Sequence, residues 1–218
     1  MEPAKIRTLV GGALASLLLA IAAPAEAQVL GTQGDAVFGA ERLFGIRAER
    51  VWAEPPAPAA EYEANHTIIS FGLANTEVPF NIPRLTFDYL AMNKFSVGGA
   101  LGFSNADSRV RGGGSTETTS FLLAPRVGFL HMFGRVGGIW PRGGLSYHRT
   151  SAEDAFVEWG LAANLECQFP IVFTPGFGML IGLAFDQTLT ANHDPENGVD
   201  YPVGYRSIGL QVGLFGWI

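Results

Sequence analysis

The sequence predicts an all-β protein, an antiparallel up-and-down transmembrane β-barrel of eight strands. Three observations predict it: alternating bulky and small residues, links of alternating length, and a final segment that is itself a strand. Between Ile208 and Leu214 every second residue is bulky and apolar, and the others are glycine or glutamine. Successive side chains of a strand point to opposite faces, so only one face is bulky. No charged residue follows Ser207, which favours a strand that closes a barrel over one with a wetted face.

Seven earlier segments repeat this period, each with its bulky residues on one face. By residue number the eight predicted strands cover 67–73, 85–91, 95–103, 121–129, 139–147, 157–165, 177–185 and 206–218. Because bulky residues occupy every second position throughout, all eight are expected to turn the same kind of face outward.

The links between these strands alternate in length. Short turns are predicted at Asn93, at Gly134 and over 169–175. The longer polar links are 75–83, 104–115, 149–154 and 188–202. Outer-membrane barrels have an even number of strands, short periplasmic turns and longer outer loops. The short turns are therefore expected to face the periplasm, and the long links to face outward.

The residues before the predicted barrel divide into two parts. Residues 1–27 predict a signal peptide, because basic residues precede an apolar run that ends in Ala25-Glu26-Ala27. Residues 28–64 form an N-terminal segment in which 38–52 is a strand or plug and 54–61 is a proline- and alanine-rich linker. A ninth spanning strand would break the even count. Unless a strand has been miscounted, the barrel spans 65–218 and 38–52 does not cross the membrane.

The small-residue faces of the strands carry charged side chains that are predicted to lie inside the barrel. An eight-stranded barrel has an interior just wide enough for side chains, and buried charges need partners. We therefore expect an interior ion-pair network. Its predicted members are Asp88, Arg126, Arg142, His148, Glu158, Glu166 and Asp186. A lipocalin-like soluble barrel would need the opposite arrangement, with the bulky residues inside.

Composition and motifs exclude several functions. The net charge of −6 lacks the basic footprint of a nucleic-acid-binding protein. The single cysteine, Cys167, cannot form an intramolecular disulfide or a cysteine-based zinc site. His66 and His148 share the inward face, but no serine stands at a spacing that makes a nucleophile–base pair. The glycines at 112–114 lack the lysine of a phosphate loop, and 194–200 lacks the spacing of a calcium loop. No catalytic residue, metal ligand or cofactor is assigned.

The pattern over 65–218, with Trp217 beside the last residue, resembles small OmpA/OmpX-type (opacity-like) outer-membrane barrels of Gram-negative bacteria. The resemblance implies an integral protein of the cell outer membrane, exported by its signal peptide, with a structural or surface-contact role. Outer-membrane lipid is the implied partner, together with an extracellular ligand or surface that the long loops would meet. A lipid-modifying outer-membrane enzyme, a narrow porin-like pore and a secreted lipocalin-like barrel are the alternatives.

Overall fold

The computed structural model describes residues 30–71, 79–109, 115–152, 155–196 and 198–218. The predicted signal peptide 1–27, residues 110–114 of the link over 104–115, and Asn197 lie outside these residues. Within the described ranges, no helix is long and apolar enough to cross a membrane.

The described chain is built almost entirely of strands. They are β1 (Ala36–Ala53), β2 (Tyr62–Phe71), β3 (Arg84–Met92), β4 (Phe95–Arg109), β5 (Ser115–Phe129), β6 (His131–Phe133), β7 (Gly137–Ala152), β8 (Phe156–Thr174), β9 (Phe177–Pro195) and β10 (Tyr201–Trp217). A single 3₁₀ turn, η1 (Pro79–Asn81), stands between β2 and β3.

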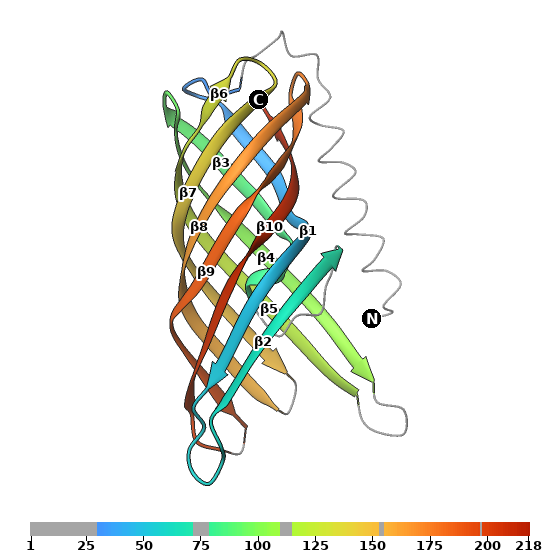
Figure 1. Cartoon of the computed structure of the whole chain (residues 1–218), viewed down its shortest axis with the longest axis vertical. Helices are drawn as coiled ribbons and strands as arrows, with labels where there is room; N and C mark the ends of the chain where they lie inside the picture. The colour runs from blue at the N-terminus through green and yellow to red at the C-terminus, as the bar shows by residue number, and fades with distance from the viewer. Residues whose placement is uncertain (1–29, 72–78, 110–114, 153–154, 197) are drawn as a thin grey trace.

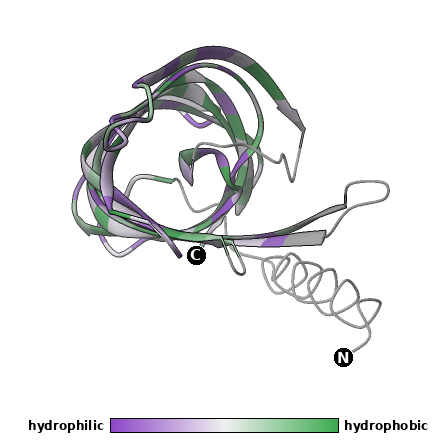
Figure 2. Cartoon of the chain, turned by 90° about the horizontal axis from the view of Figure 1, so that it is seen from below, coloured by the Kyte–Doolittle hydropathy of each residue, from purple (hydrophilic) through white to green (hydrophobic). Residues whose placement is uncertain are grey.

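Eight of these strands form a closed antiparallel ring in the order β1-β3-β4-β5-β7-β8-β9-β10 (Figures 1 and 2). The ring closes because β10 pairs with β1, from Val37 opposite Trp217 to Ala53 opposite Val203. The short β6 is paired to β7 alone, and β2 is paired to β1 alone, among the strands described. The predicted fold class, an up-and-down antiparallel barrel of eight strands, is confirmed.

The membership of the ring differs from the prediction in its first strand. Residues 38–52, expected to be a non-spanning strand or plug, belong to β1 and close the barrel. The segment expected to be the first barrel strand, 67–73, belongs in its described part to β2, which lies beside the second half of β1. The predicted start of the barrel at residue 65 is therefore wrong.

A β-bulge in β1 explains why the alternation was hard to follow there. Three residues, Glu41 to Leu43, lie between Ala40, which pairs with Leu214, and Phe44, which pairs with Val212. Arg42 has a φ of 59°, in the left-handed region that non-glycine residues rarely adopt. As a result Glu41 and Arg42 are both buried, each with 2% of its surface exposed, although they are consecutive in sequence. Such a bulge re-aims side chains locally.

The bulge also marks the point where β1 changes its neighbour. Before it, Ala36 to Glu41 pair with β3, and after it, Phe44 to Ala53 pair with β2. β2 and β4 then diverge toward the lower end of Figure 1. In the pairings of the described residues, β4 beyond Gly102 is bonded to β5 only. The wall is therefore fully paired in one half and has a seam between β2 and β4 in the other.

The bulky faces predicted from the alternation point outward around the ring. Leu101, Leu145, Leu165, Leu183 and Ile208, from five different strands, each expose more than half of their surface. A continuous apolar outer face of this size would be unstable in water. It matches the apolar band of a transmembrane barrel, in which lipid-facing and interior residues alternate. A lipocalin-like soluble barrel has the opposite arrangement and is excluded.

The two ends of the barrel differ in their connections. At the turn end, tight turns at Asn93, Gly134 and Gly176 lie with Ala36 and Ile218, at the top of Figure 1. Gly134 and Gly176 have φ values of 79° and 82°, which suit glycine in a tight turn. At the opposite loop end, longer links join β1 to β2, β4 to β5 and β9 to β10.

Several links are shorter than predicted because the strands run further. β8 continues to Thr174, so the predicted turn over 169–175 is reduced to Pro175 and Gly176. At the loop end β4 reaches Arg109 and β9 reaches Pro195. At the loop end, backbone pairing continues where the hydrophobic alternation has ended, so the alternation of side chains does not mark where these strands end.

The link over 75–83 was expected to face outward, and its described part does not. Phe80 is fully buried, Asn81 is 2% exposed and Ile82 is 4% exposed. η1 contacts β5 and β7 on the inner side of the wall. Residues 79–83 therefore fold into the barrel, and 75–78 lie outside the described residues.

Candidate functional site: the barrel interior and its loop-end pocket

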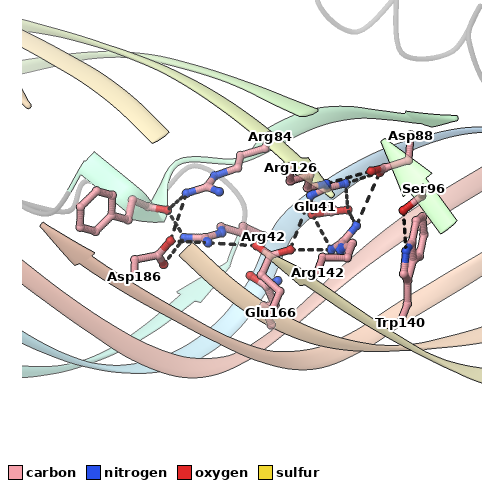
Figure 3. A network of polar contacts seen from close by, with 12 residues as sticks. Glu41, Arg42, Arg84, Asp88, Ser96, Arg126, Trp140, Arg142, Glu166 and Asp186 are labelled. Carbon is pink, nitrogen blue, oxygen red and sulfur yellow. Dashed lines mark hydrogen bonds and ion pairs between the residues drawn. The ribbon is translucent and has the colours of Figure 1, made fainter. Parts of the chain in front are cut away.

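The interior is filled in layers along the barrel axis. At the turn end lies an apolar plug of Leu30, Val37, Leu90, Leu130, Trp140, Leu180, Phe215 and Trp217. A charged layer follows in the middle, and Figure 3 shows it in line with Trp140. Beyond it a second apolar cluster surrounds Phe80 and Tyr205. A cavity at the loop end completes the series.

Glu41, from the bulge of β1, is the central acceptor of the charged layer. It accepts hydrogen bonds from Nη1 and Nη2 of Arg126, both at 2.9 Å, and from Nη1 of Arg142 at 2.6 Å (Figure 3). Arg126 also donates to Asp88, through Nε at 3.1 Å. Arg142 donates through Nη2 to Glu166 at 2.7 Å. Two guanidinium groups are thus held by three carboxylates from three strands.

Asp186 is the second acceptor of the layer, and it is surrounded by arginines. Arg42 donates to both of its oxygens, at 2.9 and 3.0 Å. Nη1 of Arg47 lies 3.4 Å from Oδ2, and Nη2 of Arg84 lies 3.8 Å from Oδ1. Arg42 also donates to Glu166 at 3.2 Å, which joins this group to the one around Glu41. Asp186 has no exposed surface.

Charges in this layer balance. The buried guanidinium groups are Arg42, Arg47, Arg84, Arg126 and Arg142, and the buried carboxylates that act on them are Glu41, Glu49, Asp88, Glu166 and Asp186. Two further buried carboxylates lie outside this layer: Asp35, which accepts from the backbone N–H groups of Gly31 and Thr32, and Glu158. Equal numbers of each sign are what an interior removed from water requires, because each unpaired buried charge costs several kcal/mol. We call these ten residues the central network.

Interior glycines make room for these long side chains. A Cβ added to Gly98 would lie 2.6 Å from Oδ1 of Asp88, and one added to Gly209 would lie 2.6 Å from Cγ of Arg47. Both positions also approach the backbone of the neighbouring strand too closely for a side chain. The small residues on the inward faces therefore leave the space that the long charged side chains occupy.

The structure separates the seven predicted interior residues into two groups. Asp88, Arg126, Arg142, Glu166 and Asp186 lie in the central network, whereas His148 and Glu158 lie together nearer the loop end. The other members of the central network escaped the sequence reasoning. Arg47 and Glu49 share the inward parity of β1, and Arg84 shares that of Asp88, so a parity signal existed. Glu41 has the same odd parity as Arg47 and Glu49, whereas Arg42 carries no such signal because the bulge turns it inward.

Glu158 has surroundings unlike those of the central carboxylates. Tyr205 donates its hydroxyl to Oε2 at 2.5 Å. Nδ1 of His193 lies 3.6 Å from Oε2, and Nε2 of His148 lies 3.8 Å from Oε1. Among the described residues no arginine or lysine pairs with Glu158. His148 is fully buried and packs edge-on to Phe80, with ring centroids 5.4 Å apart.

Glu158 borders a cavity of about 430 Å³, which we call the loop-end pocket. One wall is largely apolar and aromatic and comes from β1, β8, β9 and β10, with Trp52, Phe156, His193, Tyr201, Val203 and Tyr205. The opposite wall comes from β4, β5 and β7 and carries the hydroxyls of Ser104, Thr118, Ser120 and Thr150. The volume lies within the range of small-molecule sites.

The pocket does not assemble a recognisable catalytic or metal centre. Neither ring nitrogen of His148 has a hydrogen-bond partner in the part of the chain that the structure describes, so no serine is paired with it. Over the same residues, no group of three or more histidine, cysteine, aspartate or glutamate side chains could hold a metal ion.

Comparison with known proteins gives a likeness of fold. No protein-family model matches the chain, and no curated protein matches it by sequence. Neisserial surface protein A is similar in structure at a TM-score of 0.48 and 11% identity, over 84% of this chain and 99% of that one. The outer membrane protein OprG from Pseudomonas aeruginosa gives 0.47 and 13%, over 86% and 99%. The N-terminal β-barrel domain of Pseudomonas aeruginosa OprF gives 0.40 and 12%, over 84% and 98%. These likenesses concern the fold alone.

Proposed function

We propose that the protein is an integral barrel of the outer membrane of a Gram-negative bacterium with a structural or surface-contact role. The observation that carries this proposal is the contrast between the two sides of the wall. Outside, a continuous apolar band is exposed, and inside, a charge-balanced network fills the barrel. Lipid is the partner of the outer band, and the loop end is the part available to an extracellular ligand or surface.

The filled interior argues against a pore. The apolar plug, the central network and the cluster around Phe80 fill successive levels of the interior. Moving an ion through them would require breaking buried ion pairs, which are costly to separate. We expect no steady current when the purified protein is reconstituted into planar lipid bilayers, with a general porin as the positive control. Reproducible single-channel steps would favour the porin-like alternative.

The lipid-modifying enzyme is less well supported, because no nucleophile–base pair is assembled among the described residues. A structural or surface-contact role requires a defined orientation, with the turn end in the periplasm and the loop end outside. Short turns at Asn93 and Gly134 and the longer link between β1 and β2 support that orientation.

Cysteine labelling in intact cells tests the orientation. In a Cys167→Ser background, Ala59→Cys places a thiol in the exposed β1–β2 link, and Asn93→Cys places one in an exposed tight turn at the opposite end. We expect a membrane-impermeant maleimide to label Ala59→Cys in intact cells and Asn93→Cys only after permeabilisation of the outer membrane. The reverse pattern would invert the topology. Labelling of neither position until the cell is fully lysed would place the protein elsewhere.

A further inference from the structure

The loop-end pocket contains a carboxyl group that has no arginine or lysine partner among the described residues. Among the described residues that line it, Glu158 is the only carboxylate, and none is arginine or lysine. Among the residues whose exposure the structure describes, the exposed charges at the same end of the barrel are mainly acidic. The carboxylates are Glu54, Glu61, Glu63, Glu117, Asp194, Glu196 and Asp200, against Arg50, Arg149 and Arg206. A pocket of one sign under a rim of the same sign attracts ligands of the opposite charge.

Glu158 also has unused capacity to accept hydrogen bonds. A carboxylate has about four acceptor positions. Tyr205 occupies one of them, whereas His148 and His193 lie beyond hydrogen-bonding distance. Because only 5% of the Glu158 surface is exposed, bulk water has little access to this carboxylate. A buried acceptor of this kind is stabilised by a donor, and a charged donor gives the larger stabilisation.

An aromatic surface lies beside the carboxylate. His193 stacks on Phe156 with ring centroids 4.5 Å apart, and its ring lies 4.9 Å from that of Tyr201. Trp52 contributes a further ring to the same wall. Faces of aromatic rings attract cations and also pack against apolar groups. This wall therefore suits a ligand in which a cationic group is attached to an apolar body.

Hydroxyl groups on the opposite wall fit the same kind of ligand. Ser120 and Thr150 hydrogen-bond to each other at 3.1 Å, and Ser104 and Thr118 line the cavity with them. A primary ammonium has three N–H donors, as a lysine side chain has. It can donate to Glu158 and still have donors for hydroxyl oxygens or water.

We propose that the loop-end pocket binds a small soluble organic amine, with the ammonium group at Glu158 and the apolar body against the aromatic wall. The inference goes beyond the proposed surface role and needs only the folded barrel. Amine binding is measured on purified protein, so a negative result there is distinguishable from a negative result in the cysteine-labelling test in cells.

Isothermal titration with three matched probes tests this proposal. The full mature protein is placed in phosphatidylcholine nanodiscs and titrated with 2-phenylethylamine, 2-phenylethanol and phenylacetate, with empty discs as the blank. We expect saturable binding of the amine that is at least about tenfold tighter than that of the alcohol, since a hydrogen bond to a charged group is being compared with a neutral one. The acid should not bind. Equal binding of amine and alcohol, or no binding of the amine, overturns the proposal.

Two matched variants locate the binding. Glu158→Gln should weaken amine binding by about tenfold or more and leave the weak alcohol binding unchanged. Glu117→Gln makes the same chemical change in an exposed carboxylate outside the pocket lining and should leave both unchanged. Unaltered amine binding in Glu158→Gln would overturn the proposal. A titration in nanodiscs that contain phosphatidylethanolamine tests whether the ammonium group of a lipid occupies the pocket instead. An unchanged affinity for 2-phenylethylamine supports a soluble ligand. Loss of 2-phenylethylamine binding in these discs would assign the pocket to the lipid headgroup and overturn the proposal of a soluble ligand.

Discussion

Buried carboxylates occur in two different settings in this barrel, and the difference separates structure from function. Asp186 lies in the centre with Arg42, Arg47 and Arg84 around it. Glu158 lies near the loop end with a tyrosine hydroxyl, two imidazoles and a cavity around it. The first charge is neutralised within the protein, so it serves to fill and order the interior. The second has no arginine or lysine partner among the described residues, and it borders the cavity.

The largest expected effect comes from making the same chemical change at both carboxylates. Asp186→Asn removes the counter-charge of three buried guanidinium groups and should lower the free energy of unfolding by about 3–5 kcal/mol. Glu158→Gln keeps an oxygen for Tyr205 and uncovers no buried cation, so it should cost no more than about 1 kcal/mol. Urea unfolding of the refolded protein in lipid vesicles, followed by heat-dependent gel mobility, measures both. Equal losses would show that Glu158 belongs to the structural interior as much as Asp186 does.

A smaller effect is expected when charge is moved across the wall. Glu166 and Leu165 are neighbours on β8, the first 6% exposed inside the network and the second 60% exposed on the outer face. Leu165→Arg should cost about 2–4 kcal/mol, because an arginine at mid-membrane depth faces lipid without a partner.

Val199→Arg is the control for that change. Val199 is 67% exposed, but it lies in the link between β9 and β10. There an arginine faces water, and we expect a change within about 0.5 kcal/mol. If the two variants lose the same stability in the same unfolding assay, the apolar outer band is not in contact with lipid.

The fold could be predicted from the sequence wherever one face of a strand meets lipid and the other a crowded interior. The stretch over 177–185 is such a case, and it lies within β9 as expected. β1 could not be recognised in the same way, because the bulge at Glu41 and Arg42 places two consecutive residues inside. The end of β9 at Pro195 was also missed, since beyond the apolar band both faces are polar and only backbone pairing marks the strand.

The candidate site was predictable in part, for a related reason. The parity of a residue's position along a strand predicts which face it occupies, and it correctly predicted that Glu158 and Glu166 lie in the interior. It does not group side chains by their depth in the barrel, because depth also depends on the register and tilt of neighbouring strands. The sequence therefore predicted a single network that included Glu158 and His148, whereas in the structure Glu158 borders the loop-end pocket and His148 lies beside it. The inward fold of Pro79–Asn81 had no sequence signal that distinguished it from a surface loop.

The pairing of β1 with β10 has a consequence for how the chain can be rearranged. Ala36 and Ile218 exchange both of their backbone hydrogen bonds, at 2.9 and 3.0 Å. Residues so placed can be joined by a short linker, and new ends can then be opened in an exposed link such as the one between β1 and β2. The barrel is in this respect a circular arrangement of strands: which strand is synthesised first is a property of the gene, and the geometry of the ring does not depend on it.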